Sequence, residues 1–143
     1  MRAAASWAVA LAAACGADCP EIARILDEGG VSRVQLCIER AESELDRMRG
    51  LAGRNGLGLR DGLPRALLLV FPLEGEACIS NGSVSFAIDA LFARDDGRIV
   101  RIEHAIAASD RTVRCGVPVR YVLETEAGVL GGVREEHTLV FER

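Results

Sequence analysis

The sequence predicts a single β-rich domain of the α+β class, a mainly antiparallel sheet or partly open barrel of six to seven short strands with two or three short helices. The chain has 143 residues, which suits one domain rather than two. Half of the residues are apolar and 27% are charged, a balance that is typical of a soluble globular protein and excludes disorder. Many apolar residues occur in short alternating segments between glycine-containing turns, which favours strands over long helices.

The composition also excludes several functions. The 17 basic residues are all arginine, and with 21 acidic residues the formal net charge is −4. Non-specific nucleic-acid binding needs a basic face, and single-strand binding needs stacked aromatic side chains, whereas only 4% of the residues are aromatic. We therefore expect no nucleic-acid partner. No cofactor is expected either. An unknown small molecule or an envelope protein is the expected partner.

Residues 1–14 have the pattern of a secretory signal segment. Arg2 precedes an almost wholly apolar run that ends in small residues. This run is shorter than the ~20 residues needed to span a bilayer. Residues 12–15 also resemble a lipobox with Ala12 in the place of the usual leucine, so Cys15 is a candidate for lipidation. The alternative is an alanine-rich N-terminal helix that is retained, in a cytoplasmic protein.

The five cysteines bear on the compartment of the protein. With Cys15 lipidated or removed, an even number remains, for which three disulfide pairings are possible. Disulfides would suit an oxidising compartment outside the cytoplasm. The alternative is free buried thiols, because cysteine packs as a small hydrophobic residue. The disulfide candidates are Cys19, Cys37, Cys78 and Cys115.

Residues 15–30 are expected to form a helical N-terminal extension, and residues 31–143 the single β-rich domain. Pro20 suits the first position of a short helix, and Gly29 lies just past its end. We expect the apolar face of this helix to pack on the domain, and docking onto a larger envelope assembly is the alternative. That face has helical spacing and consists of Ile22, Ile25 and Leu26.

The first half of the domain predicts a strand, a helix and a loop. Residues 31–38 alternate between apolar and polar side chains, which predicts a strand. Residues 43–50 begin with a capping box and end with glycine, which predicts a short helix. Residues 50–62 are rich in glycine and predict a loop. Arg54 and Arg60 in this loop could hold an anion, but a mobile connection is the better interpretation.

The second half predicts further strands. Residues 66–71 are a continuous apolar run, which suits a strand buried on both faces. Residues 86–94 and 98–103 are joined by Asp95-Asp96-Gly97, a hairpin turn in which glycine supplies the positive φ. Two more strands are expected at residues 138–141 and at residues 117–124, the latter with Val117, Val119, Tyr121 and Leu123 facing inward.

Four groups of short motifs follow one another between residues 34 and 141. They are Ala41, Ser43, Asp46-Arg47, Gly50-Leu51 and Arg54; Val70-Phe71-Pro72 with Glu74-Gly75; Ile88-Asp89-Ala90-Leu91-Phe92 with Asp95-Asp96-Gly97-Arg98-Ile99-Val100; and Val122-Leu123-Glu124 with Ala127-Gly128. In this order the motifs resemble those of the uncharacterised prokaryotic family catalogued as domain of unknown function 192. The resemblance implies a compact β-rich domain, often exported and sometimes lipid-anchored, and it implies no established activity.

Two stretches depart from the pattern of that family. The family's distinctive Phe-Trp-Met-Lys-Asn-Thr stretch corresponds here to residues 79–84, which lack its aromatic pair and its lysine. The family's late Gly-Asp turn is replaced by residues 135–137. If the family has a site at the first stretch, this chain has lost or changed it.

Three charged residues lie within strands that the motifs cover: Asp89, Arg120 and Glu124. Strand alternation predicts that Glu124 faces solvent. Asp89 shares its strand face with apolar residues, so its carboxylate needs a partner, because burying an unpaired charge costs several kcal/mol. We expect Arg54 or Arg120 to pair with Asp89, and we expect these residues to line a small ligand-binding cleft.

Signals for catalysis are weak. His104 and His137 lie beside acidic residues, but no metal-ligand spacing joins them, so we expect no metal site. Cys115, His104 and Asp89 could form a nucleophilic trio, and Arg111 and Arg114 could favour a thiolate, but a disulfide is the expected role of Cys115. The sequence therefore predicts an exported, non-enzymatic binding or structural domain. The alternatives are a small Cys- or His-dependent hydrolase or redox protein, and a component of an envelope assembly.

Overall fold

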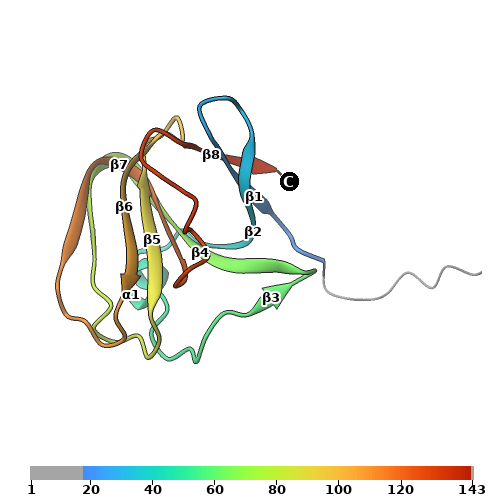
Figure 1. Ribbon diagram of the computed structural model, residues 1–143. Helices are drawn as coiled ribbons and strands as arrows, with labels where there is room; N and C mark the ends of the chain where they lie inside the picture. The colour runs from blue at the N-terminus through green and yellow to red at the C-terminus, as the bar shows by residue number, and fades with distance from the viewer. Residues whose placement is uncertain (1–17, 143) are drawn as a thin grey trace, which may run out of the picture.

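The computed structural model describes residues 18–142 (Figure 1). The predicted signal segment and Cys15 lie outside the described residues. The elements in chain order are β1 (Ile22–Leu26), β2 (Ser32–Ala41), α1 (Glu44–Arg49), β3 (Leu59–Arg60), β4 (Leu63–Ile79), β5 (Ile88–Ala93), β6 (Ile99–Ile106), β7 (Arg114–Glu126) and β8 (Thr138–Glu142). The domain is therefore mostly β-structure, and across residues 18–142 it contains one short helix.

The strands form one mixed sheet in the order β6-β5-β7-β4-β2-β1-β8, while β3 pairs with β4 outside this order. The β2–β4 pair is parallel, and the other pairs in the sheet are antiparallel. The first and last strands of the chain, β1 and β8, lie side by side (Figure 1). The prediction of a mainly antiparallel sheet is confirmed.

The sheet curls far enough for its two ends to meet at one point. Arg98, just before β6, forms an isolated antiparallel bridge with Thr138 of β8. The Leu139 N–H donates to the Gly97 carbonyl at 2.8 Å, and the Ile99 N–H donates to the His137 carbonyl at 2.9 Å. Because these bonds are confined to the start of β6, the sheet is a partly closed barrel. This seam leaves most of β6 without a second neighbour.

The central strands are buried on both faces. One set of buried side chains fills the barrel, and we call it the barrel core; a second set, the outer core, packs on the opposite face. Along β4 the two sets alternate, because Ala66 and Leu68 belong to the barrel core and Leu67 and Leu69 to the outer core. All six residues of β5 are buried. The prediction that the apolar run in β4 is buried on both faces is confirmed.

The expected N-terminal helix is wrong, because residues 22–26 form strand β1 inside the sheet. Ala23 and Ile25 are fully buried in the barrel core, while Ile22, Arg24 and Leu26 are half-buried. A segment of only five residues can show both the alternating burial of a strand and the apolar spacing of a helix, so its sequence pattern alone does not decide between them. Pairing with β2 on one side and β8 on the other decides in favour of the strand, because it satisfies the backbone N–H and C=O groups in the sheet. With this helix absent, the α+β class with two or three helices is also corrected.

The predicted helix and hairpin turn are present, whereas two details of the predicted strands differ. Ser43 caps α1 by accepting from the Asp46 N–H, and Gly50 ends the helix at φ 49°, as expected. The hairpin turn before β6 is also confirmed. Strand β4 continues past Pro72, where its register with β7 is irregular. Within β7, Val117 is 64% exposed rather than inward, and it lies in this irregular part of the pairing.

All four disulfide candidates are paired. Cys19 bonds to Cys37 and fixes the chain before β1 to β2. Cys78 bonds to Cys115, its direct partner in the β4–β7 register. The two disulfides are typical of proteins from oxidising compartments. No helix within residues 18–142 has the length and apolar character needed to cross a membrane.

Candidate functional site

A cavity of about 540 Å³ opens beside the outer core. Helix α1 and the turn after it form one side, and the segment between β4 and β5 forms the other. Strands β4 and β7 provide the base. The lining residues are Glu44, Arg47, Met48, Arg49, Gly50, Leu51, Ala52, Leu69, Phe71, Cys78, Ile79, Ser80, Gly82, Ser83, Val84 and Glu124.

Glu124 lies at the base of this cavity, and we refer to it as the Glu124 cavity. The residue is in β7, opposite Leu67 of β4 and Ala90 of β5, both of which belong to the outer core. Its exposed fraction is 6%. No described residue forms a hydrogen bond or an ion pair with its carboxylate. Burial raises the pKa of Glu124 to about 7, against an ordinary value of 4.5.

The turn after α1 brings backbone against this carboxylate. Gly50 is the C-cap residue of α1, with φ 49°. A Cβ atom at Gly50 would lie 3.6 Å from Oε2 of Glu124. Leu51, the next residue, is fully buried in the outer core and holds the turn down on the sheet. The turn thereby excludes water from one side of Glu124, which explains the raised pKa.

Arg47 is held in place at the mouth of the cavity. Its Nη1 donates to the Val70 carbonyl oxygen at 3.1 Å and also to the Glu42 carbonyl oxygen. Its guanidinium lies over the Phe71 ring, with Cζ 5.3 Å from the ring centroid, which adds a cation–π attraction. Arg49 from the same helix also lines the cavity. The site thus combines a buried carboxylate with two cations near the mouth.

Residues 79–84 form the opposite side of the cavity, and they correspond to the stretch that departs from the family pattern. Asn81 fixes this segment, because its amide nitrogen donates to the Phe86 carbonyl at 3.2 Å and the Ala107 carbonyl at 2.8 Å. Five of the six residues in the segment line the cavity. The stretch that lacks the aromatic pair and the lysine expected from the family pattern therefore forms a wall of the cavity.

The predicted cleft of Arg54, Asp89 and Arg120 does not form, because each residue has a partner elsewhere. Arg54 makes two hydrogen bonds to Glu39, at 2.9 Å each. Arg120 lies 3.6 Å from Asp95.

Asp89 is buried, and its partners are backbone N–H groups rather than an arginine. These donors are Ala105 at 2.8 Å, Gly128 at 2.9 Å and Leu130 at 3.0 Å.

Asp89 thereby fixes the irregular end of β6 and the turn after β7 to β5. One carboxylate oxygen binds the Ala105 N–H, and the other binds both N–H groups of the turn after β7. The prediction that this carboxylate needs a partner was correct, but the expected arginine was wrong. Two or three backbone N–H donors stabilise an ionised carboxylate, so a turn that surrounds the carboxylate can take the place of an arginine.

The expectation that Glu124 faces solvent is wrong. Strand alternation gives only the two faces of β7 and does not show whether either is covered. Residues 66–71 could have indicated the answer, because a strand buried on both faces needs neighbours whose two faces are also covered. Since β7 pairs with β4 along this run, the face that carries Glu124 is covered as well.

The nucleophilic trio does not form either. His104 Nδ1 lies 3.9 Å from Asp89 Oδ2, but the sulfur of Cys115 is bonded to Cys78. His137 is buried, and its Nδ1 accepts from the Arg134 N–H at 3.2 Å, which is a local structural contact.

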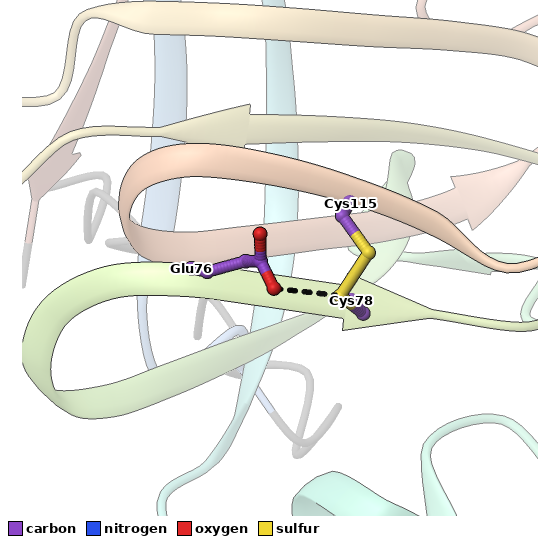
Figure 2. Close-up of side chains that lie close together, drawn as sticks. All are labelled: Glu76, Cys78 and Cys115. Atoms are coloured by element: carbon purple, nitrogen blue, oxygen red, sulfur yellow. Dashed lines mark hydrogen bonds between the residues drawn. A yellow bond between two sulfur atoms is a disulfide. The ribbon is translucent and has the colours of Figure 1, made fainter.

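Figure 2 shows Glu76 beside the second disulfide, with Glu76 and Cys78 on β4 and Cys115 on β7. Their ligand-type atoms lie within 4.8 Å of one another. Metal binding by cysteine requires thiolates, and the disulfide engages both sulfurs. With the disulfide formed, the cluster offers a metal ion only one ligand group, the carboxylate of Glu76.

A second cavity, of about 390 Å³, lies beside the Cys19–Cys37 disulfide. It is lined by acidic and basic side chains that already interact with one another. Arg40 makes two hydrogen bonds of 2.7 Å to Glu21, and Arg65 lies 3.9 Å from Glu39. The Glu124 cavity is the stronger candidate because its buried charge has no such partner.

The fold and the site define a small, partly closed β-barrel with a buried carboxylate in a cavity on its outer face. The chain belongs to the family DUF192, described as uncharacterized ACR, whose model matches residues 25–141. The resemblance inferred from the motifs is therefore confirmed.

Solved structures support the fold. A proposed transcription regulator from Sinorhizobium meliloti 1021 matches with a TM-score of 0.76 and 24% identity, over 85% of this chain and 92% of that chain. A protein of unknown function from Novosphingobium aromaticivorans DSM 12444 matches with a TM-score of 0.72 and 19% identity, over 83% of each chain. No curated protein matches the sequence.

Proposed function

We propose that this chain is an exported, non-enzymatic binding domain that holds a small molecule in the Glu124 cavity. One observation carries the proposal: a buried carboxylate without a partner among residues 18–142 lies at the base of a 540 Å³ cavity. A cavity of this size lies within the range of about 300–1,000 Å³ that is usual for small-molecule sites.

The energetics of Glu124 support a binding role over a structural one. An ionisable group buried without a hydrogen-bond partner destabilises the folded protein. Asp89 is also buried, but three backbone N–H groups donate to its carboxylate and offset the cost of burial. Glu124 has no such arrangement, so a donor supplied from outside the chain would satisfy it. Perturbed carboxyl groups in cavities are typical of functional sites.

Export is proposed from separate observations. Residues 1–14 have a signal-like pattern, Cys15 follows a lipobox-like sequence, and the four remaining cysteines form two disulfides. We propose that the mature domain is soluble in the periplasm or at the outer cell surface, or is tethered there by an acylated Cys15.

The two alternative functions have weaker support. A Cys-dependent hydrolase or redox protein needs a free thiol, whereas Cys115 is disulfide-bonded. Docking to an envelope assembly through a helix at residues 22–26 loses its basis, because that segment is a strand between β2 and β8.

The binding proposal is tested by thermal-shift screening of a small-molecule library against the purified domain. Compounds that raise the Tm of the wild type are then tested on Glu124→Gln and on Glu126→Gln. Glu126 is a matched control, because it lies on the same strand and its carboxylate already accepts from the Leu57 N–H at 2.7 Å. We expect ligands whose effect is lost only in Glu124→Gln. A full library without one Glu124-dependent compound would refute the proposal.

Export is tested by the intact mass of protein purified from its native cells, with and without reduction. Processing before Cys15, with or without an added lipid mass, supports export. An intact N-terminus together with four alkylatable thiols in residues 18–142 would contradict it.

A further inference from the structure

The Glu124 cavity offers different chemistry at its base, along its sides and at its mouth. The base carries the Glu124 carboxylate, and the mouth carries the guanidinium groups of Arg47 and Arg49. Between base and mouth the sides are mainly apolar, and they are formed by Leu51, Leu69, Phe71, Ile79 and Val84.

At the base, a cationic donor is the best complement. An ionised carboxylate in an apolar surrounding is stabilised by an opposite charge that also donates hydrogen bonds. An ammonium group does both, since it carries three N–H donors. The described residues place no arginine in contact with the Glu124 carboxylate, so the position next to it is open to a cation from a ligand.

At the mouth, the arginines favour an anionic group. Both hydrogen bonds that Arg47 makes to described residues use Nη1, so among residues 18–142 its Nε and Nη2 have no protein partner. Arg49 makes no ion pair with a described residue. Glu44 also lines the cavity, so the three charged side chains of α1 that line it sum to a formal charge of +1. A carboxylate or phosphate can pair with the guanidinium groups there.

We propose that the ligand is a small zwitterion whose ammonium group binds Glu124, whose anionic group pairs with Arg47 and Arg49, and whose apolar chain lies between them. This inference rests on the proposed function and adds the class of ligand. Each part of such a molecule matches one part of the cavity. An α-amino acid alone would not suffice, because its two charges are adjacent rather than separated by an apolar chain.

The pH dependence of binding reports which group meets Glu124. The charged side chains around it are Glu44, Arg47 and Arg49 from α1 and Glu126 from β7, whereas β4 and residues 79–84 contribute apolar and serine side chains to the cavity. With a pKa of about 7, Glu124 is mostly protonated at pH 6 and mostly ionised at pH 8. Affinity for an ammonium group should therefore rise about tenfold from pH 6 to pH 8. A ligand that meets Glu124 with a carboxylate should show the opposite trend.

Isothermal titration calorimetry with three matched probes tests the proposal: 8-aminooctanoate, octylamine and octanoate. They share an apolar chain and carry both charges, the cation alone and the anion alone. For the wild type at pH 8, we expect 8-aminooctanoate to bind most tightly, octylamine next and octanoate least. Stronger binding of octanoate than of octylamine would overturn the proposed orientation.

Variants of Glu124 and Arg49 test which residue binds each charged group of the probe. Glu124→Gln should weaken 8-aminooctanoate about tenfold or more and remove the pH dependence, because a charged hydrogen bond is lost. Arg49→Gln should weaken 8-aminooctanoate while leaving octylamine unchanged. Glu126→Gln should change neither. Equal losses of both probes in Arg49→Gln would contradict the anionic contact.

The zwitterionic ligand and the binding function can be refuted separately. If none of the three probes binds while the library screen yields another Glu124-dependent ligand, the zwitterion is wrong and the binding function stands. If neither the probes nor the screen yields a Glu124-dependent ligand, both fail.

Discussion

Glu124 should make the stability of the free protein depend on pH. Its pKa is about 7 in the folded state and near 4.5 when exposed, so between these values the folded state holds a proton that the unfolded state has lost. The free energy of unfolding should fall by about 3 kcal/mol from pH 4.5 to pH 7 and then level off. Glu124→Gln should remove this fall, because glutamine does not titrate.

Urea denaturation at pH 5, 6, 7 and 8 measures the effect. The difference in free energy of unfolding between Glu124→Gln and wild type should grow in favour of the variant from pH 5 to pH 7 and change little between pH 7 and pH 8. Glu126→Gln is the control and should follow the wild-type profile. A wild-type profile that parallels Glu124→Gln at every pH would show that the Glu124 carboxyl group is not perturbed.

Asp89 is expected to be essential for stability. Asparagine has one acceptor oxygen in place of two, so Asp89→Asn leaves at least one of the three N–H donors around this buried side chain without its acceptor. We expect a loss of about 2–4 kcal/mol in the free energy of unfolding, measured with urea at pH 7. The exposed Asp96, which accepts from the Arg98 N–H, is the matched control, and Asp96→Asn should cost about 1 kcal/mol or less. Similar losses in both variants would argue against the special role of Asp89.

At the scale of elements, the seam of the barrel depends on Gly97. Its φ is 87°, and a Cβ atom there would collide with the Leu139 carbonyl oxygen of β8. Gly30 also has positive φ, at 78°, but has open space around it. Gly30→Ala should therefore cost about 1 kcal/mol from backbone strain alone. Gly97→Ala should cost about 3 kcal/mol or more, because the clash adds to the strain.

Thermal and urea denaturation of the two alanine variants separate these contributions. Hydrogen exchange at the Leu139 and Ile99 amides, which donate across the seam, should accelerate in Gly97→Ala and not in Gly30→Ala. Equal destabilisation of the two variants would mean that β8 yields to the added methyl group without cost.

The elements that could be predicted from the sequence are those with a local cause. The cap of α1 at Ser43 and the turn at Gly97 follow from side-chain chemistry within a few residues. Strand β1 could not be predicted reliably, because its five residues fit two periodicities and the choice depends on β2 and β8. Glu124 was missed for a similar reason, since its burial is caused by α1 and by residues 79–84 rather than by its own strand.

At the scale of the whole molecule, the two disulfides should contribute unequally. Cys19–Cys37 spans 18 residues and Cys78–Cys115 spans 37. The larger loop restricts the unfolded chain more, so removing the bonds as paired Cys→Ala variants should cost about 3 and about 4 kcal/mol respectively. Urea denaturation measures both. If either paired variant were as stable as the wild type, the disulfide that it lacks would not stabilise the protein by restricting the unfolded chain.

The open side of the seam has a consequence for self-association. Past Ile99, β6 ends the strand order and pairs with β5 alone, so its outer backbone groups could template a strand from another copy. The same strand carries Arg101 and Glu103, which are joined by an ion pair of 2.5 Å, and it places the partly exposed His104 beside them. Burying these charges against a second molecule would cost desolvation energy. This charged edge should keep the folded protein from aggregating, although its barrel is not fully closed.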